Sequence, residues 1–457
     1  MYDTIAAIAT ARGEGAIGIV RLSGDNALNV LNKIATLKSG LSVLNMKARK
    51  LYYGHIVDGE KKVDEILVAY MKGPKTYTCE DVIEINCHGG VVPLTEILKL
   101  VLKHGARMAE PGEFTQRAFL NGRLDLAQAE SVMDLISAKT QTGFDIAIEQ
   151  LGGSLSSKVD SIRQHILTVM SKIEVNIDYP DEDIEEVTYK EIESEFEIVE
   201  EDIYQLLLSS ESGRIIREGL NTVIIGKPNV GKSSLMNALL RESRAIVTDI
   251  PGTTRDVIEE YINIKGIPVK IMDTAGIRET EDIVEKMGVE KSKELFNNAD
   301  LVIIVLNSAE ALSEEDKHIL DVIHDKKVVV IVNKIDLPQK IDEAELYEIL
   351  PNIRVIKTSI TNETGLDELE DAIATMVYGG QITQKNQAVV TNVRHITSLE
   401  NSLKSIKEAM KAVRGGLPLD FIEVDVKNTY DYLGEIIGET VEDDLVKKIF
   451  SSFCLGK

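Results

Sequence analysis

The sequence contains no tryptophan and only three cysteines among its 457 residues. Cys79, Cys87 and Cys454 show no Cys-x-x-Cys spacing and are too few for a disulfide framework. Aromatic residues make up 5% of the chain, so a stacking platform for nucleic-acid bases would be sparse. The longest apolar runs, such as residues 301–306, have the length of a strand and cannot span a bilayer. The N-terminal residues resemble no signal peptide, so we expect a cytoplasmic protein without a membrane attachment.

Positive charge is also scarce, because 51 lysines and arginines face 75 acidic residues and give a net charge of −24. Such a balance argues against a protein that binds nucleic acid with its whole surface. The acidic excess is partly local: residues 181–211 hold thirteen acidic side chains and one lysine, which predicts a solvated helix face. A nucleic-acid partner would have to use a restricted basic patch.

The hydrophobic pattern divides the chain into blocks. Residues 1–122 mix strand-like and helix-like runs, which predicts an α+β domain. Residues 123–214 and 381–457 show the three- and four-residue apolar spacing of helices, whereas residues 215–380 alternate strand and helix. We therefore predict an α/β domain inserted into one helical domain, with two independent helical domains as the alternative.

The α/β block opens with a phosphate-binding loop, because residues 226–233 read Gly-Lys-Pro-Asn-Val-Gly-Lys-Ser between a strand and a helix. In this context, backbone N–H groups and the helix N-terminus surround the phosphates. Lys232 would reach the β- and γ-phosphates, and the Ser233 hydroxyl would hold Mg²⁺. The alternative is a chance glycine-rich turn. Asn229, Val230, Gly231 and Ser234 complete the contacts expected at this loop.

Two further motifs favour guanine nucleotides. Asn333-Lys334-Ile335-Asp336 follows a strand, and the Asp336 carboxylate can accept hydrogen bonds from guanine N1–H and N2–H₂ that adenine cannot donate. Lys334 would cover the base, Asn333 would tie this loop to the phosphate loop, and the segment around Ser359 would offer a backbone N–H to guanine O6. The other motif consists of Asp273, Thr274, Ala275 and Gly276 and follows another strand. Its aspartate can act on Mg²⁺ through a water molecule, and its glycine N–H can contact the γ-phosphate.

A polar segment between these motifs has the composition of a switch loop that senses the γ-phosphate. Within it, Thr254 is the candidate for a second hydroxyl on Mg²⁺. Ile277 stands where Ras-like proteins carry a glutamine that orients water. Another polar residue must therefore orient the water, and an added cation must offset the transition-state charge. The segment contains Thr248, Asp249, Ile250, Pro251, Gly252, Thr253 and Thr254.

Over essentially its full length, the chain resembles the tRNA-modification GTPases of the MnmE or TrmE family. The markers are the Pro-Gly-Glu-Phe-Thr-Gln-Arg-Ala-Phe-Leu-Asn-Gly-Arg-Leu-Asp-Leu segment at residues 111–126, Asn229 in the phosphate loop, the Gly-Thr-Thr-Arg-Asp switch loop and the final Phe-Cys-Leu-Gly-Lys. The resemblance implies a Ras-like P-loop GTPase domain inserted into a helical domain and preceded by an α+β folate-binding domain.

The same resemblance implies a K⁺ ion that takes the place of an arginine finger and a Glu285 side chain that orients the attacking water through a second water. It further implies Mg²⁺ held by Ser233 and Thr254, and nucleotide domains that meet across a dimer during turnover. The implied K⁺ ligands are the side chain of Asn229 and oxygens of Thr248, Ile250 and Thr253.

For the N-terminal domain, the resemblance implies a homodimer and a bound 5-formyltetrahydrofolate-type folate as one-carbon donor. Arg21, Glu84, Arg123 and Lys457 match the family's folate contacts; from the residues alone, the first three read as surface ion-pair residues. The resemblance also implies an FAD-dependent partner protein, joined in a heterotetramer, and action on carbon 5 of the wobble uridine of tRNA. A ribosome-assembly GTPase is the alternative, since such proteins share the loop motifs. A third interpretation, a membrane-associated scaffold GTPase, has no support in the sequence, which contains no lipidation or spanning signal.

Overall fold

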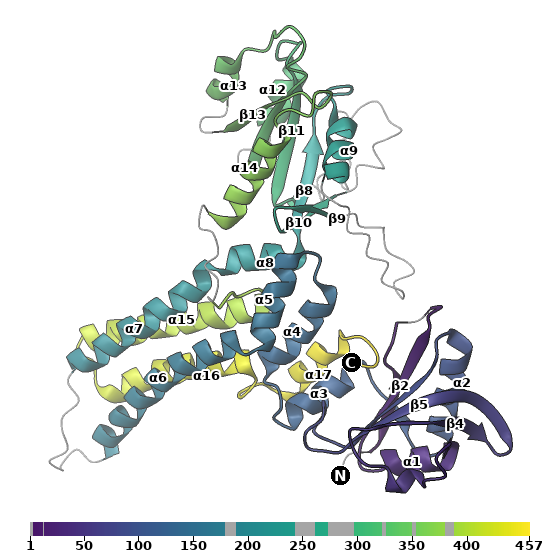
Figure 1. Ribbon diagram of the computed structural model, residues 1–457. Coiled ribbons are helices and arrows are strands. Elements are labelled where there is room, and N and C mark those ends of the chain that lie inside the picture. Colours follow the sequence, from purple (N-terminus) through teal and green to yellow (C-terminus); the bar gives the residue numbers. More distant parts are fainter. Residues whose placement is uncertain are drawn as a thin grey trace. The chain divides into compact units, whose positions relative to one another are not determined.

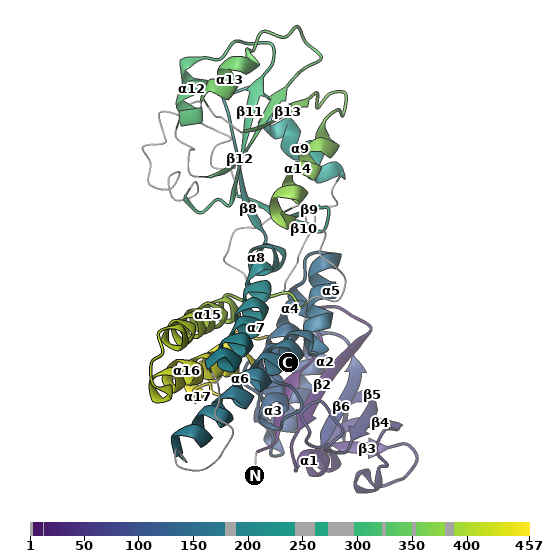
Figure 2. The same ribbon diagram turned by 90° about the vertical axis from the view of Figure 1, so that its left-hand side faces the viewer.

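The computed structural model describes residues 3–11, 13–178, 189–242, 261–272, 297–321, 326–349, 353–379 and 388–457. The chain forms two compact units (Figures 1 and 2). The first comprises Met1–Met133, Leu151–Gln164 and Tyr430–Lys457, and the second comprises Asp134–Gln150 and His165–Thr429. Helical segments from both sides of the α/β block therefore occur in each unit, and the exact domain boundaries stay a prediction.

A seven-stranded sheet organises the first unit, in the order β3-β4-β5-β6-β2-β1-β7. Neighbouring strands are antiparallel except for β1 and β7, which pair in parallel. The register places Arg21 of β2 opposite Glu84 of β6, so their side chains share one face of the sheet. The strands are β1 (Ile5–Ile8), β2 (Ile17–Ser23), β3 (Ala35–Leu37), β4 (Leu51–Asp58), β5 (Lys61–Met71), β6 (Val82–His88) and β7 (Arg107–Met108).

Two amphipathic helices, α1 (Ala27–Ile34) and α2 (Val91–Lys103), contribute their apolar faces to one core with this sheet. Leu31 and Ile97 pack in that core with Val20 and Ile85 of the strands. The short 3₁₀ helix at Val43–Asn45 adds Val43 to the same core. Alternate residues of the strands point away from it, as half-buried strands require.

A smaller apolar cluster joins the end of the chain to the helices that follow the sheet. Phe450 and Phe453 pack with Leu126 and Phe119. The last residues then pass the start of α3, where the backbone N–H of its N-cap residue Gly112 donates to the carbonyl of Cys454 at 3.3 Å. The helices involved are α3 (Glu113–Leu120), α4 (Leu126–Ser137) and α17 (Asp443–Ser451), and α6 (Ser154–Asp178) and α16 (Leu419–Ile437) contribute residues to both units.

The second unit contains a six-stranded sheet in the order β13-β12-β11-β8-β10-β9, parallel except for the β9–β10 pair. The central strand β11 is buried along its whole length, as a parallel strand covered on both faces must be. The strands are β8 (Leu220–Ile225), β9 (Tyr261–Ile264), β10 (Ile267–Ile271), β11 (Leu301–Asn307), β12 (Lys327–Asn333) and β13 (Arg354–Thr358).

Helices cover both faces of this sheet and form two separate cores (Figure 2). Leu235 of α9 and Ile373 of α14 pack on one face. Leu320 of α12 and Leu346 of α13 pack on the other. The result is the three-layered α/β arrangement that the alternation of strands and helices predicts. These helices are α9 (Lys232–Glu242), α12 (Glu314–Asp321), α13 (Glu343–Ile349) and α14 (Leu366–Tyr378).

Apart from Glu211 on α8 (Ser210–Glu218), the described acidic residues of this run lie on α7 (Tyr189–Leu208), whose apolar side chains are buried and whose carboxylates face outward. Arg414 of the neighbouring helix α15 donates to Glu193 and Glu197 of α7. The prediction of a solvated acidic helix face is therefore confirmed for these residues. Among the described residues, no helix is long and apolar enough to cross a membrane. The other helices of this unit are α5 (Gln141–Leu151), α7 (Tyr189–Leu208), α8 (Ser210–Glu218) and α15 (Val393–Arg414).

Candidate functional site

The phosphate loop lies between the end of β8 and the start of α9. Glycine is required at both of its ends, because Gly226 has φ +147° and Gly231 has φ +111°. A Cβ on Gly226 would lie 2.3 Å from the carbonyl oxygen of Val305 in the neighbouring strand. The sequence thus folds here into the tight strand–loop–helix turn that presents backbone N–H groups to phosphates.

Lys232, the first residue of α9, folds back over this loop. Its Nζ donates to the carbonyl oxygens of Gly226 and Lys227, the latter at 2.7 Å. Burial lowers the pKa of the Lys232 ammonium. A phosphate bound at the loop would favour the charged form, because its negative charge would lie beside the ammonium. Ser233 and Ser234 are exposed in the first turn of α9, where the positive end of the helix dipole lies.

The phosphate loop and the guanine loop are joined through Asn333, the last residue of β12. The residue is 3% exposed, and its Nδ2 donates to the carbonyl of Val230 at 2.9 Å. Its Oδ1 accepts from the hydroxyl of Thr358 at 3.2 Å. A Cβ on Gly231 would lie 2.2 Å from Nδ2, so the glycine leaves room for this amide. The two loops are therefore positioned as one unit, as the sequence predicted for Asn333.

The other residues of the guanine loop are also held in place. Lys334 has φ +63°, and its Nζ donates to the carbonyl of Asn229 at 2.7 Å. Asp336 is exposed, and one of its carboxylate oxygens accepts from the hydroxyl of Ser359 at 2.6 Å. The backbone N–H of Ser359 donates to the carbonyl of Thr364. The contribution of Ser359 is thus to orient Asp336, and a contact with guanine O6 would have to come from another amide of this loop.

Lys227 is a residue of this site that the sequence did not single out. Its ammonium lies 2.8 Å from the buried carboxylate of Asp316 on α12 and donates to the hydroxyl of Ser313 at 3.1 Å. Burial opposes the charge of Lys227, but these partners raise its pKa. These contacts join the phosphate loop to a helix more than eighty residues further along the chain. No local sequence motif predicts them.

The predicted switch residues, the Mg²⁺-side motif and the predicted catalytic residue lie outside the described residues. Of the predicted metal ligands, only Ser233 and Asn229 are among the described residues. Both belong to the phosphate loop and are exposed, and Asn229 has a φ of +64°. The predicted residues outside the description are Thr248, Asp249, Ile250, Pro251, Gly252, Thr253, Thr254, Asp273, Thr274, Ala275, Gly276 and Glu285.

A second polar site lies in the first unit, where the two ends of the chain meet. Arg21 donates from Nε and Nη2 to the Glu84 carboxylate at 3.0 and 2.8 Å. The Arg21 side chain is 20% exposed and the Glu84 side chain is 24% exposed. The Arg21 guanidinium also lies 5.8 Å from the centre of the Phe114 ring and donates to the carbonyl of Gly456 at 3.4 Å. Burial, together with the charge of Arg21, lowers the pKa of Lys457. Three of the four predicted folate residues are thus brought together.

Arg123 is held by a different element. It stacks on Tyr77, with its guanidinium 4.7 Å from the ring centre, and donates to the carbonyl of Tyr77 at 3.3 Å.

Two of the cysteines differ in their surroundings. Cys454 is exposed, whereas Cys87 is buried. Because burial raises the pKa of the Cys87 thiol to about 11, Cys87 is not a reactive thiol.

A parallel sheet with a glycine-rich phosphate loop, tied to an Asn-Lys-x-Asp loop at the end of a later strand, defines a P-loop GTP-binding protein. A family model described as the MnmE helical domain matches residues 126–454, and one described as the GTP-binding protein TrmE N-terminus matches residues 4–123. The chain belongs to the family of tRNA modification GTPases MnmE. The predicted family, the predicted fold class and the assignment as a GTPase are thereby confirmed.

Among curated relatives, the tRNA modification GTPase MnmE of Alkaliphilus oremlandii is 58% identical over 457 residues, which are 100% of this chain and 99% of the relative. The proteins of the same name from Alkaliphilus metalliredigens and Clostridioides difficile are each 54% identical, again over 100% of this chain and 99% of the relative. The G domain of the T. maritima FeoB iron transporter is 31% identical over 34% of this chain and 95% of that chain, with a TM-score of 0.25.

Proposed function

We propose that this protein is a K⁺-stimulated GTPase that acts with an FAD-dependent partner protein on tRNA. The reaction adds an aminomethyl-type or carboxymethylaminomethyl group at carbon 5 of the wobble uridine, with a formyl-tetrahydrofolate-type one-carbon donor. The observation that carries this proposal is the presence of two sites in one chain, a nucleotide site and a cationic site around Arg21, in a chain whose full-length relatives are named tRNA modification GTPases.

For GTP hydrolysis, we assign Mg²⁺ to Ser233 and Thr254, and K⁺ to Asn229 with oxygens of Thr248, Ile250 and Thr253. The exposed hydroxyl of Ser233 and the exposed side chain of Asn229 suit these ions, because both lie at the loop that would surround the phosphates. The cations would neutralise charge that develops on the phosphates. Lys232 supplies a further positive charge from the protein, and Glu285 would orient the attacking water.

For the folate, we assign Arg21, Glu84, Arg123 and Lys457. Burial, and after it the charge of Arg21, lowers the pKa of Lys457, and an anionic glutamate tail would favour the charged ammonium again. Glu84 can accept hydrogen bonds from the N–H groups of a pteridine ring, as a carboxylate bound to one arginine keeps free lone pairs. These residues therefore suit a ligand with one anionic end and one donor-rich ring.

We further propose a homodimer whose second copy covers the open face of the N-terminal sheet. Ile17, Leu51, Tyr53 and Leu67 lie on that face and are exposed, Leu51 to 66%. Large apolar side chains grouped on a sheet face indicate a protein contact. Two partner proteins on such a dimer would give a heterotetramer. The cytoplasmic location stays a prediction of the sequence.

The decisive experiment is nucleoside analysis of tRNA from cells that lack this protein. We expect wobble uridines without the carbon 5 group, and restoration by the wild-type chain. Normal wobble uridines would refute the proposal and favour the ribosome-assembly GTPase.

The hydrolysis mechanism is tested separately on the purified protein. GTP turnover should rise several-fold when Na⁺ is replaced by K⁺, and Glu285→Ala should nearly abolish turnover at almost unchanged GTP affinity. Glu281→Ala, in the same segment, serves as the matched control. Equal rates in the two salts would remove the K⁺ assignment, and a Glu285→Ala variant that hydrolyses GTP normally would remove Glu285.

A further inference from the structure

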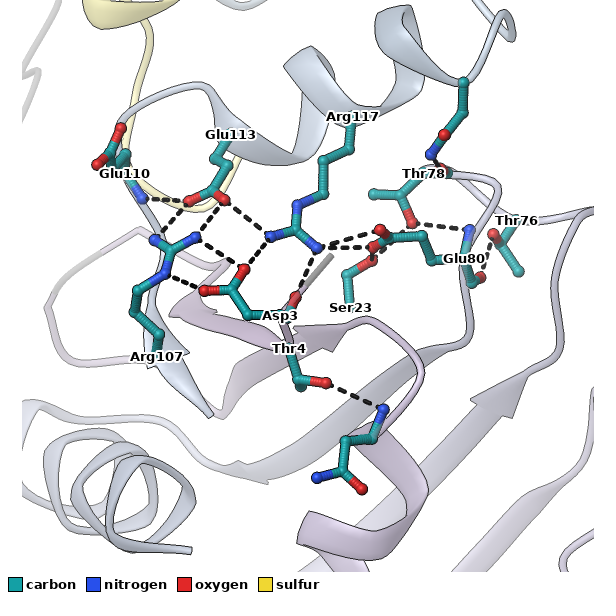
Figure 3. Close-up of polar contacts among 12 residues, drawn as sticks. Asp3, Thr4, Ser23, Thr76, Thr78, Glu80, Arg107, Glu110, Glu113 and Arg117 are labelled. Carbon is teal, nitrogen blue, oxygen red and sulfur yellow. Dashed lines mark hydrogen bonds and ion pairs between the residues drawn. The ribbon is translucent and has the colours of Figure 1, made fainter. Parts of the chain in front are cut away.

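A network of charged side chains lies beneath the second site. It consists of Asp3, Glu80, Arg107, Glu113 and Arg117, and we call it the arginine network (Figure 3). Arg117 lies at its buried end, where the residue is 3% exposed. It donates to Glu80 at 3.1 Å, to Glu113 at 2.9 Å, and to the carboxylate and carbonyl of Asp3 at 2.9 and 2.8 Å.

Burial makes this network sensitive to the loss of any member. Burial opposes ionisation of Glu113, but hydrogen bonds from Arg107, from the Glu110 backbone and from Arg117 outweigh it and lower the pKa of Glu113. An arginine removed from such a set leaves buried carboxylates without a counter-charge, which is costly. The planar guanidinium of Arg117 serves three partners at once, and a lysine ammonium cannot reproduce that geometry.

One branch of the network leads to Arg123. Glu80 accepts from the hydroxyl of Ser23 at 2.7 Å, and Ser23 shares a hydrogen bond of 2.6 Å with Thr78 (Figure 3). Thr78 follows Tyr77, the residue on which Arg123 stacks. Ser23 is also two residues from Arg21 on β2. Glu80 therefore fixes the loop that carries the Arg123 platform against the strand that carries Arg21.

A second branch leads to Arg21 and to the end of the chain. Glu113 is the first residue of α3, and the next residue, Phe114, is fully buried beneath the Arg21 guanidinium. The backbone N–H of the preceding residue, Gly112, donates to the carbonyl of Cys454. A Cβ on Gly112 would lie 2.5 Å from the carbonyl of Phe450, so the segment that ends in Lys457 packs directly on the start of α3.

We propose that Arg117 is a positioning residue for the ligand site of Arg21, Arg123 and Lys457. Through Glu80 it fixes the loop under Arg123, and through Glu113 it fixes the start of α3 under Arg21 and the final segment. Arg117 itself does not touch the ligand in this assignment. The inference rests on the proposed folate function, because the ligand it positions is the folate.

The test is calorimetric titration of the full-length protein with 5-formyltetrahydrofolate. We expect Arg117→Lys to weaken binding roughly tenfold, since the lysine keeps the charge but loses the hydrogen bonds that set both branches. The matched control is Arg163→Lys. Arg163 is also buried in the first unit, where it pairs with Glu439 at 2.6 Å and stacks on Tyr430 at 4.1 Å. The control should bind the folate as the wild type does, and GTP turnover without folate should be equal in all three proteins.

The outcomes separate the possible failures. Wild-type affinity in Arg117→Lys, or an equal loss in Arg163→Lys, would overturn the positioning role. No binding by the wild type would instead refute the proposed folate function. If Arg117→Lys does not fold, Ser23→Ala leaves Arg117 in place and removes the hydrogen bonds that join β2 to Glu80 and to Thr78. It should weaken folate binding by about threefold to tenfold, and unchanged affinity would overturn the proposal.

Discussion

Replacement of Asn333 by alanine should uncouple the phosphate loop from the guanine loop. The asparagine, a residue that is 3% exposed, makes two side-chain hydrogen bonds, to Val230 at 2.9 Å and with Thr358 at 3.2 Å. Each such bond contributes about 1 kcal/mol, and an unsatisfied buried carbonyl at Val230 adds roughly 1 kcal/mol or more. The loss is therefore about 2–3 kcal/mol.

This loss should appear largely in nucleotide affinity. GTP must contact both loops at once, so loops that are no longer aligned in advance must be ordered by the ligand itself. A loss of about 2–3 kcal/mol corresponds to a GTP dissociation constant roughly 30- to 150-fold higher. The measurement is a titration with a fluorescent guanine nucleotide, followed by competition with unlabelled GTP and by a melting curve of each variant.

Two further variants make the reasoning falsifiable. Thr358→Val removes only the bond to Asn333 Oδ1 and should weaken binding by about fivefold. Gly231→Ala should weaken it at least as much as Asn333→Ala, because its Cβ would lie 2.2 Å from Asn333 Nδ2 at a φ of +111°. An Asn333→Ala protein that folds and binds GTP within twofold of the wild type would refute the coupling.

Three other predictions concern single residues. Asp336→Asn should lose GTP and gain xanthine nucleotides in competition titrations, because an amide N–H donates where the carboxylate accepts; retained GTP preference would contradict it. Gly456→Ala should weaken 5-formyltetrahydrofolate binding in calorimetry, because its Cβ would lie 2.4 Å from the carbonyl of Ile8 at a φ of +94°; equal affinity would count against the docked final segment. The hydrogen bond from Arg107 lowers the pKa of Asp3 from 3.8 to about 2, so its stabilisation is present above pH 3.8 and is lost as the pH falls toward 2. Asp3→Asn should therefore lower the melting temperature at pH 5 more than at pH 2, and an equal decrease at both would exclude this linkage.

The motifs of the nucleotide site could be predicted because they are local. A phosphate loop needs glycines at fixed spacing between a strand and a helix, and residues 226–233 supply them, so the sequence alone indicates a nucleotide site. The Asn333 tie was also predictable, since its motif follows a strand that must end at the same sheet edge as β8. The fastening of Lys227 to Asp316 was not, because nothing in the loop specifies which helix will lie beside it.

The second site shows the same limit more strongly. From the residues alone, Arg21, Glu84 and Arg123 read as surface ion-pair residues without assigned partners. The register of β2 and β6 is what pairs Arg21 with Glu84. Tertiary packing brings this pair to the final segment that ends in Lys457, where the contacting residues are 435 positions apart. It also connects Arg123 to Arg117 through Tyr77, Thr78 and Glu80.

The sequence by itself therefore determined the class of nucleotide, the order of strands and helices and the family, because each depends on short patterns that act through neighbouring residues. The tertiary structure decided which charges are buried together and which loops are joined by hydrogen bonds. Such contacts arise when distant segments pack to remove apolar surface from water, and the charged groups that come with them must then find partners within that packing.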